Sequence, residues 1–191
     1  MQLRNTTERW GAGAKCLHWT LALAIFVMMA LGWIMTAWPK SPAKFEMYFV
    51  HKSLGIVILA LMVLRLCWRL LNPTPRLPKT LKPYERVLAH GTHALLYLLL
   101  LAMPVSGWVI NSAANFPLKV FGLFNLPPLV GPDKAVQGQA EVVHLWLFWI
   151  VGGLLVLHIG AALKHHFVLR DEVLARMLPD QRSQRDIPEM E

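Results

Sequence analysis

The hydrophobic positions of this chain fall into four long runs, separated by short polar segments that are rich in proline and basic residues. The runs cover about residues 16–38, 51–71, 85–111 and 141–163. About 20 consecutive apolar residues are enough for one helix to cross a bilayer core. The pattern therefore predicts an all-α integral membrane protein, with one transmembrane domain at residues 1–178 and a polar tail at 179–191.

The composition agrees with a membrane protein. Hydrophobic residues make up 55% of the chain and charged residues only 16%, which lies well outside the range of soluble domains. The net charge of +8 raises nucleic-acid binding as an alternative, but the basic residues flank the apolar runs and form no single patch. We therefore expect a lipid bilayer, and no nucleic acid, as the partner of these surfaces.

The basic residues are divided unevenly between the two ends of the predicted helices. Fourteen of the 19 Lys and Arg residues lie in the N-terminal segment, the second connector and the C-terminal tail, and five lie on the opposite side. Flanks rich in Lys and Arg usually stay in the cytoplasm. The chain is thus predicted to form a four-helix up-down-up-down bundle with both termini cytoplasmic.

Proline residues mark places where regular structure should change. Pro104 and Gly107 predict a kink in the outer half of the third helix. The loop at residues 112–140 is the longest and contains four prolines. Residues 116–126 within it are a candidate for a short segment at the membrane interface.

Four histidines occupy the predicted membrane region in a regular way. His144 and His158 lie on the fourth run, about 21 Å apart along a helix axis and within about 40° of the same face. His18 lies near the cytoplasmic end of the first helix, and His51 lies near the outer end of the second. The topology therefore predicts two level pairs, an inner pair of His18 and His158 and an outer pair of His51 and His144.

Intramembrane histidines usually indicate a functional site, although each one alone could also be an ordinary hydrogen-bonded residue. Two neutral imidazoles at one depth, with no carboxylate or thiolate nearby, suit bis-histidine haem iron. Zinc normally takes four ligands, and neither depth offers a third. The chain has no C-x-x-C-H motif for covalent haem, and Cys16 and Cys67 predict no disulfide framework. The sequence thus predicts two non-covalent haem b groups inside the bundle.

Other polar residues near the helix ends are candidates for supporting roles. His90 and His93, on one face of the third helix, are candidates for a quinone site or proton relay, or else are plain interfacial residues. Arg65, Arg69 and Lys52 are candidates for haem propionate binding, with contact to lipid phosphates as the alternative. Glycines in the second and fourth helices are compatible either with room for a macrocycle or with close helix packing.

Several segments of the chain resemble the bacterial cytochrome b561 family, which includes a superoxide:ubiquinone oxidoreductase. The resemblance covers roughly residues 10–178 and rests on KCLHWTLALAIFVMM, HKSLGIVILALMVLRLCWRL, NPTP, LAHGTHALLYLLLLAMPVSGWV and LHIGAALKHHFVLRDEVLARMLP. It implies a protein of the bacterial inner membrane with two b haems, and the same four axial ligands: His18, His51, His144 and His158. It also implies periplasmic superoxide as the electron donor and ubiquinone as the acceptor.

A superoxide donor gives the outer basic residues a further interpretation. Lys40, Lys44 and Lys52 are candidates for steering this small anion to the outer face. The sequence assigns no catalytic residue. Two other functions stay open: a haem-bearing anchor that relays electrons for a separate dehydrogenase or hydrogenase, and a transport or scaffold bundle without a cofactor.

Overall fold

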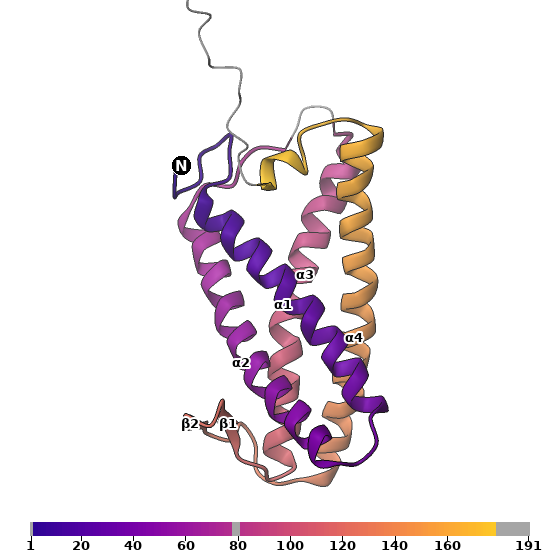
Figure 1. The fold of residues 1–191 in the computed structure, drawn as a ribbon. Helices are drawn as coiled ribbons and strands as arrows, with labels where there is room; N and C mark the ends of the chain where they lie inside the picture. Colours follow the sequence, from indigo (N-terminus) through magenta and orange to yellow (C-terminus); the bar gives the residue numbers. More distant parts are fainter. Residues whose placement is uncertain (1, 78–80, 179–191) are drawn as a thin grey trace, which may run out of the picture.

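The computed structural model describes residues 2–77 and 81–178 and contains four long helices that pack in sequence order into an elongated bundle (Figure 1). The helices are α1 (Ala12–Ala37), α2 (Pro42–Leu71), α3 (Pro83–Ala113) and α4 (Lys134–Leu163). Each is long and apolar enough to cross a membrane, with a mean hydropathy between 1.8 and 2.2 over its most apolar stretch. The predicted four-helix membrane bundle is confirmed. The predicted polar tail at 179–191 lies outside the described residues.

Two helices begin earlier than their hydrophobic runs predict. α2 begins at Pro42 and not near residue 51, because the Ser41 hydroxyl accepts a hydrogen bond from the backbone N–H of Lys44 and proline suits the first helical position. α4 begins at Lys134 and not near residue 141, because Asp133 accepts from two backbone N–H groups of the first turn. Capping thus extends both helices beyond their apolar segments.

Most side chains of the bundle point outward. Large apolar residues such as Leu23 and Leu157 are 69% and 66% exposed, as expected for surfaces that face lipid. The buried centre is small and is formed by Leu21 and Ile25 of α1 with Ile58 and Met62 of α2. These four residues fill the middle of the bundle, between the depths at which the histidine pairs lie.

The outer loop contains a β-hairpin, where the sequence predicted only an interfacial segment. Its strands are β1 (Leu118–Val120) and β2 (Phe124–Leu126), paired antiparallel. The turn between them has positive φ at Phe121 and Gly122, as tight hairpin turns require. The fully buried hydroxyl of Ser53 accepts from the N–H of Phe121 and contacts the Lys119 carbonyl. The hairpin is therefore fastened to α2, at the end opposite the N-terminus (Figure 1).

The inner end is closed by segments from three parts of the chain. After α4 come a π-helical turn, η1 (Lys164–Val168), and a 3-10 turn, η2 (Ala175–Met177). Lys15 and Trp19 of α1 donate hydrogen bonds to the backbone carbonyls of Leu178 and Met177. Arg176 donates to the carbonyl of Arg76 in the connector after α2. The described ends of the chain therefore meet at one end of the bundle.

Candidate functional site

The structure brings the predicted outer pair together. His51 of α2 and His144 of α4 face each other with ring centroids 6.5 Å apart and ring planes at 70°. Both residues are partly buried. The two rings come from helices that are not neighbours in the sequence, so their approach reflects the packing of the whole bundle.

The inner pair has nearly the same geometry. His18 of α1 and His158 of α4 have ring centroids 6.3 Å apart and ring planes at 64°. α4 thus contributes one ring to each pair. Between its two histidines, Val151 is buried, and Leu155 packs against the apolar centre.

These separations fit an iron ion between two imidazoles. An imidazole nitrogen binds such a metal at about 2.0 Å, and the ring centroid lies about 1.1 Å behind that nitrogen. Two rings on opposite sides of one iron therefore have centroids about 6.2 Å apart, close to both observed values. Over residues 2–77 and 81–178, no group of three or more His, Cys, Asp or Glu could hold a metal. The donor set suits haem and does not suit a structural zinc ion.

Glycines lie against the rings of the outer pair. A Cβ atom placed on Gly32 of α1 would come within 3.3 Å of His51 Cε1, and one on Gly107 of α3 within 3.4 Å of His144 Cε1. A side chain at Gly32 would therefore press on the His51 ring, and one at Gly107 would come into contact with the His144 ring. The glycines of α2 and α4 that the sequence analysis considered do not lie against these rings: Gly55 and Gly152 lie near Met28 and Met29 of α1, and Gly153 and Gly160 face open space.

The polar neighbours of the outer pair are uncharged. The hydroxyl oxygen of Ser106 lies 2.8 Å from Nδ1 of His144. Nδ1 of His51 is buried and has no hydrogen-bond partner among the described residues. The two outer rings therefore differ at Nδ1: that of His144 has a hydroxyl at hydrogen-bond distance, and that of His51 has no partner among the described residues.

The inner pair lies beside two arginines. Arg65 of α2 approaches Nδ1 of His18 at 2.8 Å, and the guanidinium groups of Arg65 and Arg69 each lie 5.6 Å from the ring centroid of Tyr97. A guanidinium only donates, so Nδ1 of His18 accepts, and a neutral ring then carries its proton on Nε2. If Nε2 were to bind iron, the ring proton would have to be on Nδ1, and Arg65 could then no longer donate to that nitrogen. The two arginines are then well placed to receive a haem propionate.

The two histidines predicted to share a face of α3 are separated by the packing. The His93 ring lies 5.4 Å from that of His158 and is half-buried, whereas His90 is exposed. His158 therefore has two histidine neighbours. His18 lies at the separation that a shared iron requires, and His93 lies closer than that.

The predicted steering lysines are placed at the outer end with different partners. Lys44 donates to the Thr36 and Trp38 carbonyls at the end of α1. Lys52 donates to the side chain of buried Asn111 at 3.1 Å, and Lys40 is exposed. Lys52 is turned toward α3 in this arrangement, and the structure shows no contact between it and either outer ring.

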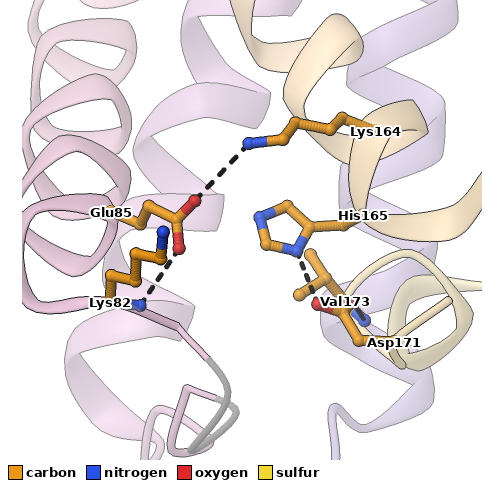
Figure 2. A network of polar contacts seen from close by, with 6 residues as sticks. All are labelled: Lys82, Glu85, Lys164, His165, Asp171 and Val173. Carbon is orange, nitrogen blue, oxygen red and sulfur yellow. Dashed lines mark hydrogen bonds and ion pairs between the residues drawn. The ribbon is translucent and has the colours of Figure 1, made fainter. Parts of the chain in front are cut away.

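A polar network that the sequence did not single out closes the inner end between α3 and α4 (Figure 2). Lys164 forms an ion pair with Glu85 at 3.5 Å, and Glu85 also accepts from the N–H of Lys82 at the start of α3. Buried His165 pairs through Nδ1 with Asp171 at 2.5 Å. The Lys164–Glu85 pair joins the segment after α4 to the beginning of α3, and the His165–Asp171 pair lies within the segment after α4.

Sequence reasoning missed Ser106, Gly32 and Asn111. A lone serine or glycine in an apolar helix has no periodic signal, so only the packing of α3 on α4 reveals the contact of Ser106. Ser106 and Gly107 lie close to Pro104 in the sequence, where a kink was predicted, and this was the one indication that the region is unusual. Pro104 lies inside α3, which is one helix from Pro83 to Ala113, and the kink stays a prediction.

Comparison with known proteins gives matches over most of the chain. The family model described as prokaryotic cytochrome b561 matches residues 9–180. Cytochrome b561 homolog 2 of Escherichia coli is 37% identical over 185 residues, which cover 93% of this chain and 95% of the relative. Probable superoxide oxidase CybB of Yersinia pestis is 32% identical over 170 residues, covering 87% and 93%. Cytochrome b561 homolog 1 of Escherichia coli is 27% identical over 164 residues, covering 85% and 93%. The chain belongs to the prokaryotic cytochrome b561 family, whose members bind haem b and transfer electrons in bacterial membranes.

Proposed function

We propose that this protein is a di-haem oxidoreductase that moves electrons from superoxide at the outer face to ubiquinone. In this proposal, His51 and His144 hold the outer haem b, and His18 and His158 hold the inner one. When bound, the two groups supply successive one-electron steps across the bilayer core, and bis-histidine ligation leaves no open position for dioxygen.

The observation that carries the proposal is the repeated geometry of the two pairs. Their ring separations of 6.5 and 6.3 Å both agree with a shared iron, and α4 contributes to each. A single pair of facing histidines could arise from ordinary packing. Two pairs with matching separations at two depths are better explained by two similar cofactors.

The donor is proposed from a relative and from the outer lysines. One relative is named a probable superoxide oxidase. On this chain, Lys40, Lys44 and Lys52 lie at the outer end, where Lys40 is exposed. Cationic groups around an entrance raise the arrival rate of a small anion, an effect that salt weakens.

The acceptor site is proposed at the inner end, beside His158. Ubiquinone needs two electrons and two protons to become the quinol, whereas superoxide donates one electron at a time. His93 is half-buried and contacts the His158 ring from a third helix. It is therefore well placed to hydrogen-bond a quinone carbonyl near the inner haem. His90 is exposed and is not part of the proposed quinone site.

The arginines of α2 are proposed to bind the inner haem propionates. Arg65 and Arg69 share contact with Tyr97, which keeps both guanidinium groups on one side of the inner pair. Lys52 remains a weaker propionate candidate at the outer pair, because its ammonium group already has Asn111 as a partner.

The orientation is proposed from charge. The N-terminal segment, the connector after α2 and the segment after α4 meet at one end of the bundle, and these segments carry most of the basic residues. By the positive-inside rule, this end and both termini lie in the cytoplasm, with the protein in the inner membrane.

One experiment tests the donor and the acceptor together. Purified protein in liposomes or detergent is mixed with an enzymatic superoxide source, and the haem absorption bands are followed with and without a soluble ubiquinone analogue. We expect the bands of the reduced form to appear, to be suppressed by superoxide dismutase, and to decay when quinone is added. Bands that stay oxidised with superoxide, but become reduced with a co-purifying dehydrogenase or hydrogenase, would instead support the anchor function.

A further inference from the structure

Ser106 on α3 makes two short contacts with one oxygen atom. Its side chain is buried, with 9% of the residue exposed. The hydroxyl oxygen lies 2.7 Å from the backbone carbonyl of Met103, one turn earlier, and 2.8 Å from Nδ1 of His144 on α4. A serine in an apolar helix commonly bonds to its own backbone. The second contact, to a ring on another helix, needs a separate explanation.

The two contacts together determine where the protons lie. The Met103 carbonyl can only accept, so the serine hydroxyl donates its single proton there. The oxygen then offers only lone pairs to His144, which must donate through a protonated Nδ1. A neutral ring with its proton on Nδ1 has a free lone pair on Nε2.

The partner ring has no comparable support. His51 Nδ1 is buried and has no hydrogen-bond partner in the described part of the chain. Gly32 leaves space beside this ring, since a Cβ atom there would lie 3.3 Å from His51 Cε1. The outer pair therefore contains one ring whose tautomer and orientation are set by a hydrogen bond and one ring whose tautomer is not.

We propose that Ser106 is the positioning residue of the outer site, and this rests on the haem ligation proposed above. By accepting from Nδ1, Ser106 keeps the His144 Nε2 lone pair directed toward His51. It also makes His144 the more electron-rich of the two axial ligands. Hydrogen bonds of this kind raise the basicity of a metal-bound imidazole, which favours the ferric state. Ser106 thus lowers the midpoint potential of the outer haem and leaves the inner haem unaffected.

The test compares Ser106→Ala, Ser106→Thr and the matched control Ser112→Ala in the full-length purified protein. Ser112 also lies on α3, is buried and bonds to its own backbone through Trp108, but its second partner is the outer-loop residue Leu129. The readouts are haem per chain and the midpoint potential of each haem by spectroscopic redox titration. His51→Ala, which removes the proposed outer haem, identifies the midpoint that belongs to the inner one.

We expect Ser106→Ala to keep two haems, since both proposed ligand rings remain, and to raise the outer midpoint. The expected shift corresponds to a roughly fivefold increase in the ferrous-to-ferric ratio at a fixed potential. Threonine should restore the original value because it keeps the hydroxyl. Loss of the outer haem in the alanine variant alone, with recovery in the threonine variant, would equally support the positioning role.

Two unchanged midpoints in Ser106→Ala, or the same shift in Ser112→Ala, would overturn the proposal for Ser106. A shift of the inner midpoint alone would overturn it as well. A different result would show that the proposed haem ligands themselves are wrong: His51→Ala would then retain as much haem as the unmodified protein.

Discussion

The two histidine pairs have almost the same separation but very different neighbours. The outer rings, His51 and His144, contact glycines and the neutral hydroxyl of Ser106. The inner pair lies beside Arg65, with Arg69 close to it on the same tyrosine. Equal separations suit the same cofactor chemistry at both depths, whereas unequal neighbours should give the two sites different electronic properties.

The sign of this difference follows from electrostatics. A cation near a redox centre favours the form that carries one more electron, and it acts most strongly away from bulk water. Arginines beside the inner site should raise its potential, while the hydrogen bond from His144 should lower that of the outer site. Electrons that enter at the outer face would then move energetically downhill toward the inner end. The predictions below test this contrast.

The largest expected effect is the selective loss of one haem. His51→Ala and His144→Ala should each remove the outer haem, and His18→Ala and His158→Ala should each remove the inner one, because a single imidazole holds haem iron much more weakly than two. Haem extraction by acidified solvent should fall from about two per chain to about one in each variant. If the His18 and His51 variants lost the same haem, the assignment of the pairs would be wrong.

The second prediction concerns the inner cations. Arg65→Gln should lower the midpoint of the inner haem, because unit charges about 10 Å apart at an effective permittivity of about 20 interact by about 1.7 kcal/mol, or more than tenfold in the ferrous-to-ferric ratio. Spectroscopic redox titration would measure this midpoint. Arg65→Lys is the matched control that keeps the charge. An equal shift of both midpoint potentials would contradict the proposed difference between the inner and outer sites.

Quinone reduction should distinguish His93 from His90. His93→Phe should slow the reoxidation of the haems by a ubiquinone analogue roughly tenfold, the expected cost of about one hydrogen bond. His90→Phe, on the exposed side of α3, should leave the rate unchanged. Stopped-flow absorption would follow the decay of the reduced bands. Loss of haem in His93→Phe would instead identify His93 as the ring that shares iron with His158.

The smallest expected effect concerns the approach of superoxide. Changing Lys40 and Lys44 to Gln should slow haem reduction by superoxide about threefold at low salt, and the difference should vanish as ionic strength rises. Lys52→Gln should contribute less, because its ammonium group is bonded to Asn111. Rates that depend on neither salt nor these lysines would show that steering is absent.

The helices and the histidine pairs could be predicted because both rest on repeating signals. Hydropathy over 20 residues identifies a membrane helix, and helical geometry places His144 and His158 on one face. The starts of α2 and α4 could not be predicted from hydropathy, because Ser41 and Asp133 cap polar turns that lie before the apolar segments. Local capping extended helices that hydropathy alone would have shortened.

The remaining features depend on contacts between distant residues. The hairpin strands are three residues long and are fastened by Ser53, which is 66 positions from Lys119. Helical spacing placed His90 and His93 about 60° apart on one face of α3, but only the packing on α4 decides that His93 turns inward. The contact of Ser106 with His144 likewise depends on how α3 and α4 are rotated toward each other.

The position of α4 in the chain has a consequence for how the protein is made. Each histidine pair takes one ring from α4, and α4 is the last long helix of the described residues, so it leaves the ribosome after α1, α2 and α3. A nascent chain in which α1, α2 and α3 have already entered the bilayer carries half of both ligand sets and completes neither. Under the proposed ligation, haem therefore binds only after α4 has entered the membrane. A chain that ended before α4 would lack both haems.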